Sequence, residues 1–140
     1  MAKALGTNGT LSELDVRKTG LDDEDMLVLS DALLDPERRL NTGLPHLSCN
    51  VFHLRPRDLA PEIARPKEVT DGAALLLCGL LRFNTTVAEL NLGGTGPQPY
   101  ALGPIVLQGL KDALGPKGNK ESKLEKIDLN QCFKSLAGDP

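Results

Sequence analysis

An internal repeat constrains the fold of this chain more than any other feature of its sequence. Residues 4–16 align without a gap to residues 80–92, at a constant spacing of 76 residues. The two segments share Leu, Asn, Thr, Glu and Leu at matching positions, and most of the other pairs are conservative. Self-similarity at a fixed spacing is the sequence signature of architectures built by stacking similar units. We therefore expect the chain to be built from repeated units.

The centre of the match is a Leu-x-x-Leu-x-Leu pattern that recurs four times in degenerate form, with copies beginning at Leu11, Leu44, Val87 and Leu124. Side chains of a strand point alternately to its two faces. One face of each copy is therefore apolar and the opposite face is polar. A strand with two or three inward apolar side chains is too small to be stable alone, so neighbouring copies must stack.

This pattern resembles the leucine-rich repeat, Leu-x-x-Leu-x-Leu-x-x-Asn/Cys-x-Leu, and the Asn-x-Thr lead-in resembles its ribonuclease-inhibitor-like subfamily. The resemblance covers most of the chain. It implies an α/β solenoid, with parallel strands on a concave face and helices on a convex face. In the family, the Asn/Cys side chain hydrogen-bonds the turn backbone. That position is occupied here by Thr19, Phe52, Thr95 and Cys132, of which Phe52 departs from the family pattern.

Helical patterns lie between the expected strands. Residues 22–34 have an acidic first turn and an apolar stripe, Thr70 is placed to cap a helix that runs to about Arg82, and Pro104 suits the first turn of a third helix. Strand patterns that alternate with helix patterns predict parallel strands. We expect these strands near residues 14–16, 47–49, 90–92 and 127–129, each beside the next in chain order.

The copies are farther apart than the family unit of about 20 to 29 residues. The excess falls in polar segments, which we interpret as surface insertions at residues 35–43, 55–69 and 115–123. The sequence therefore predicts a single leucine-rich repeat domain over residues 1–140 that is incomplete at both ends. Incomplete ends leave apolar strand edges uncovered, so we expect end-to-end self-association.

Two motifs are superficially similar to a metal site and to a phosphate-binding loop, but their spacing does not favour either. His46, Cys49 and His53 have a metal-like spacing, but His46 and Cys49 would face opposite sides of a strand, whereas zinc ligands must converge. Cys49 is better explained as a core residue that replaces leucine. Residues 93–96 are rich in glycine but lack the phosphate-loop pattern, which favours a tight turn. We expect no metal and no cofactor.

Composition excludes several classes of protein. The net charge is -3 and the insertions mix both signs, which argues against nucleic-acid binding. No apolar run has the length of a signal peptide or of a membrane span, which needs roughly 20 residues. We therefore expect a cytoplasmic protein that does not bind membranes and keeps its cysteines reduced. Carboxylates lie on the strands without a neighbouring nucleophile, so we expect no catalytic residues and no enzymatic activity.

The resemblance implies a protein–protein interaction module that binds its partner through the concave strand face. The residues expected to point outward from that face are Glu13, Asp15, Arg17, His46, Ser48, Asn50, Glu89, Asn91, Lys126, Asp128 and Asn130. Acidic side chains outnumber basic ones in this set, so the partner is expected to present a basic surface. One alternative is a regulator that resembles Ran GTPase-activating proteins, and another is a nonfunctional repeat fragment.

Overall fold

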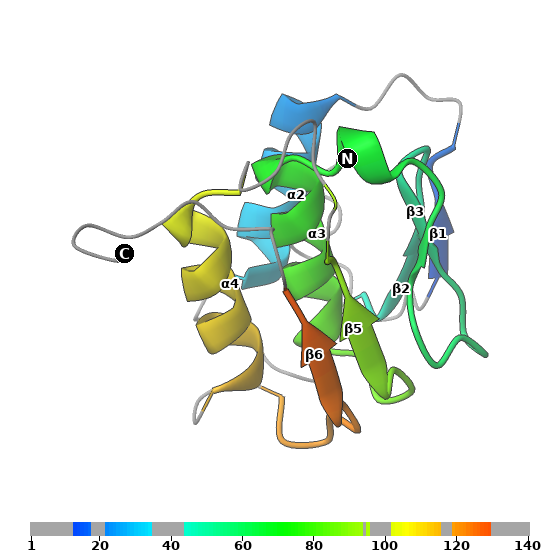
Figure 1. Ribbon diagram of the computed structural model, residues 1–140. Helices are drawn as coiled ribbons and strands as arrows, with labels where there is room; N and C mark the ends of the chain where they lie inside the picture. Colours follow the sequence, from blue (N-terminus) through cyan, green and yellow to red (C-terminus); the bar gives the residue numbers. More distant parts are fainter. Residues whose placement is uncertain are drawn as a thin grey trace.

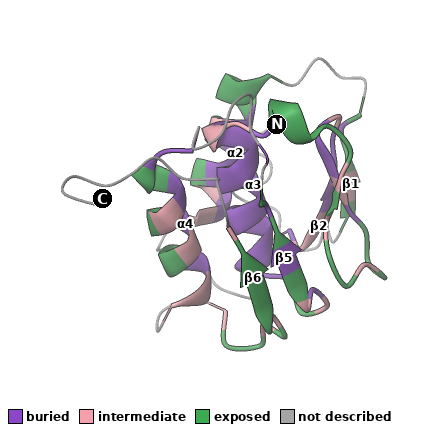
Figure 2. Ribbon diagram, in the orientation of Figure 1, coloured by how far each residue is buried: buried purple, intermediate pink, exposed green. Residues whose placement is uncertain are grey.

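Helix α3 (Asp71–Leu81) forms the centre of the computed structural model, which describes residues 13–17, 22–34, 44–93, 95, 102–115 and 119–129. Its sequence is apolar on all sides, and a helix of this kind must be buried on all sides. Every residue from Gly72 to Leu81 is indeed buried. Helices α2 (Asp23–Leu34) and α4 (Pro104–Leu114) pack against it, as Figures 1 and 2 show. The three helices thus form one layer.

Two glycines allow this close packing. A Cβ atom added at Gly79 would lie 2.8 Å from the Cβ of Leu33 on α2, and one added at Gly109 would lie 2.6 Å from Cδ2 of Leu75 on α3. Separations below 3.0 Å would force the neighbouring atoms to move. The absence of a side chain at each position therefore sets how closely α2 and α4 approach the central helix.

Polar contacts align the helices in parallel. Asp23, in the first turn of α2, accepts hydrogen bonds from the hydroxyl of Thr70 and from the backbone N–H of Gly72, the latter at 2.9 Å. At the opposite ends, Arg82 donates from Nη1 to the carbonyl oxygen of Leu33 at 2.8 Å. Thr70 occupies the N-cap position of α3, as expected, although its side chain bonds Asp23 rather than the helix backbone. These contacts satisfy helix-terminal groups that would otherwise lack intrahelical partners.

The strands form two sheets. The first has the order β1 (Glu13–Asp15), β2 (His46–Ser48), β3 (Phe52–Leu54) and β4 (Glu62–Ile63), and the second pairs β5 (Glu89–Asn91) with β6 (Lys126–Asp128). The pairs β1–β2 and β5–β6 are parallel, whereas β2–β3 and β3–β4 are antiparallel. The two sheets and the helix layer enclose one core, which is mostly aliphatic and includes Phe52 and Phe83.

The predicted leucine-rich repeat solenoid is wrong. Strands do occur at the four expected places, each shifted by one residue, and two of the three expected parallel pairs form. A solenoid, however, also requires β2 to pair with β5, and among the described strands β2 pairs with β3 instead. The protein is a small α/β domain with a four-stranded mixed sheet and a two-stranded parallel sheet.

The physical cause of this difference is a tight hairpin directly after β2. The N–H of Cys49 donates to the carbonyl oxygen of Phe52 at 2.8 Å, which reverses the chain. Phe52 and Leu54 are then buried completely, with the half-buried His53 between them. Three residues with strand alternation thus occupy the edge of β2 that the solenoid would have left for β5.

The segment at residues 55–69, predicted as a surface insertion, extends the sheet. It contains β4 and the short 3-10 helix η1 (Pro66–Glu68). The carbonyl oxygen of Leu59 accepts the N–H groups of Ala88 and Glu89, at 2.7 and 3.1 Å, and so joins this segment to the start of β5. Of the other expected insertions, residues 35–43 lie outside the described residues and 115–123 are described in part.

None of the described helices has the length and apolar character to span a membrane.

Candidate functional site

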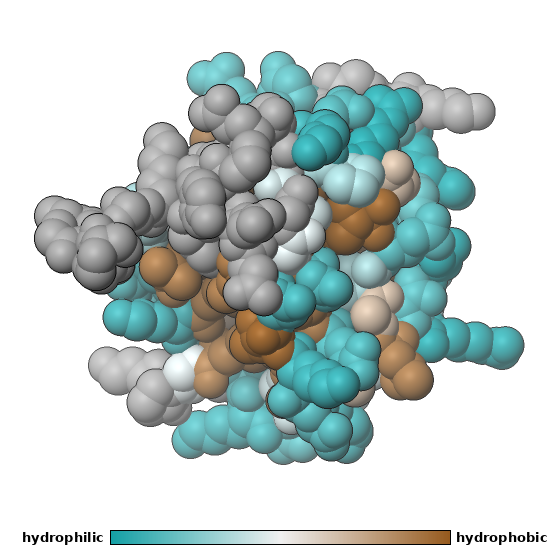
Figure 3. Space-filling view, in the orientation of Figure 1, coloured by the Kyte–Doolittle hydropathy of each residue, from teal (hydrophilic) through white to brown (hydrophobic). Residues whose placement is uncertain are grey.

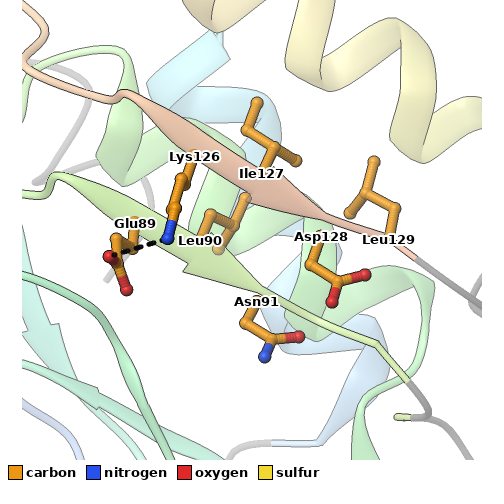
Figure 4. A pocket seen from close by; sticks show the side chains of 7 residues that line it. All are labelled: Glu89, Leu90, Asn91, Lys126, Ile127, Asp128 and Leu129. Carbon is orange, nitrogen blue, oxygen red and sulfur yellow. Dashed lines mark ion pairs between the residues drawn. The ribbon is translucent and has the colours of Figure 1, made fainter.

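The outer face of β5 and β6 is the best candidate site. Along β5, Glu89 and Asn91 are exposed, and Leu90 between them is buried in the core. All three residues of β6 are exposed. An open hollow of about 680 Å³ lies against these strands. Its lining residues, drawn in Figure 4, are Glu89, Leu90, Asn91, Lys126, Ile127, Asp128 and Leu129.

Parallel register places four polar side chains side by side. Glu89 lies opposite Lys126 and Asn91 lies opposite Asp128. The Nζ atom of Lys126 is 4.0 Å from Oε1 of Glu89, and the two side chains are 80% and 59% exposed. An ion pair this exposed contributes little to stability, because water screens both charges. These charges therefore stay available to an incoming ligand.

The backbone that follows β5 bonds Asn91 and passes close to Asp128. The N–H of Gly93 donates to Oδ1 of Asn91 at 2.9 Å. A Cβ atom at Gly93 would lie 3.1 Å from that same oxygen and 3.3 Å from Oδ1 of Asp128, so glycine provides the room in which these side chains meet. The next residue that the structure describes, Thr95, donates from its hydroxyl to the carbonyl oxygen of Leu92 at 2.7 Å. Thr95 therefore bonds the turn backbone, as its position in the sequence pattern predicts.

The beginning of β5 is fixed by Asn84, the buried asparagine of the internal repeat. Its Oδ1 accepts the N–H groups of Thr86 and Val87, both at 2.8 Å, and its Nδ2 donates to the carbonyl oxygen of Pro45 at 3.1 Å. Asn119, which no sequence pattern singles out, donates in turn to the carbonyl oxygen of Asn84 at 2.6 Å. These two amides order the loops from which β5 and β6 start.

The face of β1 and β2 carries a second polar group of residues. Arg17 binds Asp15 through Nε at 2.9 Å and Nη2 at 2.6 Å, and its N–H donates to the same carboxylate at 3.0 Å. These hydrogen bonds, the side-chain bonds foremost, lower the pKa of Asp15 to about 2. Since the guanidinium is committed to this pair, the two charges largely cancel toward a partner.

The same face is less accessible at its centre. Asp15, Ser48, His53 and Glu62 lie opposite one another across β1 to β4. Only 8% of Ser48 is exposed, and His53 is half-buried. Ser48 therefore contributes little surface to a partner, and it is buried together with its neighbour Leu47.

The structure divides the residues expected at the binding face between two sheets. The β1–β2 sheet carries Glu13, Asp15, Arg17, His46, Ser48 and Asn50, whereas the β5–β6 sheet carries Glu89, Asn91, Lys126 and Asp128. Asn130 lies outside the described residues. One continuous concave face is not formed, because β3 and β4 extend the first sheet in its place.

The cysteines that the structure describes belong to the core. Cys49 is buried, as predicted, and burial raises the pKa of its thiol. Burial also raises the pKa of Cys78 to about 12. Both thiols are free. Within the described part of the chain, no three His, Cys, Asp or Glu side chains come together as metal ligands.

No protein-family model matches this chain, and a search of curated proteins also finds no match. The family resemblance thus stays a prediction of the sequence, and its implication for the fold is wrong.

Proposed function

We propose that this chain is a protein-binding module that recognises a basic segment of a partner protein through the outer face of β5 and β6. The observation that carries the proposal is the placement of four exposed polar side chains on two adjacent strands over an open hollow. The buried Leu90 anchors these strands in the core, so the polar face is held in a defined geometry. The proposal includes the cytoplasmic location expected from the sequence.

Charge supports a basic partner. The face presents two carboxylates, Glu89 and Asp128, and one ammonium group, Lys126, which leaves a surplus of one negative charge. Asn91 presents its amide oxygen Oδ1 beside Asp128; this oxygen accepts from the N–H of Gly93 and has a second lone pair. Carboxylates and amide oxygens accept hydrogen bonds from lysine and arginine. Because the charges are exposed, they act mainly on the rate of association, which falls as salt is added.

A lysine-rich peptide of about a dozen residues is a suitable probe, and its glutamate-substituted counterpart is the matched control. In an NMR titration, we expect the lysine peptide to shift the amide signals of Glu89–Asn91 and Lys126–Asp128. The shifts should weaken as sodium chloride is raised, since the Debye length falls from about 10 Å at 0.1 M to about 3 Å at 1 M. The glutamate peptide should leave these signals unchanged.

Two substitutions on β5 test the same face in opposite directions. Glu89→Gln should weaken peptide binding, and Asn91→Asp should strengthen it while keeping an oxygen that accepts from Gly93. Glu24→Gln, at an exposed position on α2, is the matched control and should change nothing. Equal affinities for the Glu89 and Glu24 variants, or shifts confined to other elements, would contradict the proposal.

The GTPase-activating alternative rests on the family resemblance, and no contact among the described residues favours it. An assay of stimulated GTP hydrolysis separates it from passive binding, since a binding module leaves the hydrolysis rate unchanged.

A further inference from the structure

One edge of β6 has no neighbour among the described strands. On its inner edge, the N–H of Lys126 donates to the carbonyl oxygen of Ala88 at 3.1 Å, and the carbonyl oxygen of Asp128 accepts from Leu92 at 2.9 Å. Backbone groups of successive strand residues point to opposite edges. The N–H and C=O of Ile127 therefore point toward the outer edge, where they are available to another strand.

Apolar surface continues from this edge onto α4. Ile127 alternates with Lys126 and Asp128, so its side chain points to the opposite face of the strand from the two charges. An isoleucine on that face is expected to be buried, but Ile127 is 48% exposed. Leu129 beside it is half-buried, as are Leu110 and Leu114 on α4. Figure 3 shows apolar atoms gathered between α4 and the β6 strand. The core thus reaches the surface at the same place as the open strand edge.

We propose that a second copy of this chain docks on β6, with its own β6 antiparallel and the two-fold axis at Ile127. The two Ile127 residues then exchange both of their outward-pointing backbone hydrogen bonds, and their side chains meet over the apolar surface. The β5–β6 sheets of the two copies join into one sheet of four strands.

The charges of β6 are self-complementary in this register. Lys126 of one copy lies opposite Asp128 of the other, and the symmetry repeats the pair. These residues form non-hydrogen-bonded pairs, in which opposed side chains are closest. An axis at Lys126 or at Asp128 would instead place like charges opposite each other, which is unfavourable. The sequence Lys-Ile-Asp thus selects a second copy in one register.

The interface is short, so its association should be reversible and concentration-dependent. Stable protein interfaces usually bury about 1,200 Å² or more, which a three-residue strand and one flank of α4 approach only in part. Sedimentation equilibrium of the full chain should therefore show a shift from monomer to dimer between about 10 μM and 1 mM, the range of weak association. High salt should reduce the dimer fraction.

Charge exchange on β6 tests the register directly. Lys126→Asp places two aspartates opposite each other, and Asp128→Lys places two lysines opposite each other. Each single variant should dimerise about tenfold more weakly than the unaltered chain. The double variant should dimerise as the unaltered chain does, because the opposed pairs are restored. Lys120→Asp, which replaces an exposed lysine outside the strand, is the control and should keep the original dimer.

Mixing the Lys126→Asp and Asp128→Lys variants is the most stringent test. Neither variant is complementary to a second copy of itself, but in the mixed pair two aspartates lie opposite two lysines, so a heterodimer should form. Its formation also shows that both variants fold. A chain that sediments as a monomer at every concentration, as it would if its own residues covered the edge, overturns the proposal. Failure of the mixed variants to pair also overturns it. Failure of this experiment leaves the proposed function standing, because dimerisation is measured without peptide, although Lys126 and Asp128 belong to both surfaces.

Discussion

Adjacent residues of β5 should respond in opposite ways to substitution, because the strand buries one and exposes the other. Leu90 is 2% exposed and belongs to the aliphatic core, whereas Asn91 is exposed on the outer face. We expect Leu90→Asp to unfold the domain, since burying a carboxylate without a partner costs several kcal/mol. Asn91→Asp should cost far less, about 0.5 kcal/mol, because the side chain is exposed and water screens its repulsion with the carboxylate of Asp128 opposite it.

The contribution of the Leu90 side chain to the free energy of unfolding is best measured with a substitution that keeps the fold. Removing a buried leucine side chain costs about 2 to 5 kcal/mol, because it forfeits apolar transfer energy and leaves a cavity. Leu90 is fully enclosed, so we expect Leu90→Ala to cost about 3 kcal/mol. With a urea dependence of about 1.5 kcal/mol per molar, its unfolding midpoint should fall by about 2 M. The midpoint of Asn91→Asp should stay within about 0.3 M of the original.

Urea titrations followed by far-ultraviolet circular dichroism measure both midpoints under one condition. The slopes should agree among the unaltered chain and the two variants, so that midpoints report stability alone. In the matched variant, aspartate at position 91 keeps an oxygen that accepts from the N–H of Gly93. Equal losses of midpoint at positions 90 and 91 would refute the face assignment, and with it the placement of the polar side chains on the outer face.

Three further predictions test other parts of the structure. Arg82→Met should destabilise the protein by about 1.5 to 3 kcal/mol in the same urea assay, because the buried carbonyl of Leu33 loses a charged donor; no loss would show that this contact is dispensable. The carboxyl signal of Asp15 should titrate in NMR at about 2, because Arg17 lowers its pKa, and Arg17→Gln should return the midpoint toward 3.8. A pKa lowered by folding stabilises the protein above about pH 4, so this contribution is lost as the pH falls from 3.8 to about 2. Cys78, whose pKa burial raises to about 12, should react with Ellman's reagent at pH 8 only as fast as the protein opens, and rapid labelling of the folded chain at this residue would place it at the surface.

The positions of the main elements could be predicted from the sequence because the signals are local. The run of apolar residues in α3 has no polar side, so it predicts a buried helix wherever the neighbours lie. Alternation of polar and apolar residues around Leu14, Leu47 and Leu90 places strands at those points, within one residue of the observed ones. The same alternation separates the buried Leu90 from the exposed Glu89 and Asn91 of the candidate site.

The partners of those strands were decided only by the tertiary structure. A backbone hydrogen bond depends little on side-chain identity, so the apolar face of β2 fits an antiparallel β3 as well as a parallel β5. The chain reaches Phe52 after a turn of a few residues, and pairing with this nearby strand is favoured over pairing with a distant one because closing a short loop costs less entropy. Its two buried side chains then hold the hairpin in the core.

The edge of β6 that no described strand covers likewise exists only in three dimensions. The sequence determines that Lys126, Ile127 and Asp128 alternate in character, and therefore that both charged side chains share one face. The register with β5 decides which edge of β6 is covered, and the helix layer ends at α4. Both depend on contacts between segments that are far apart in the chain. Local propensity contains no information about such contacts, because their free energy arises from surfaces that meet only after the chain has folded.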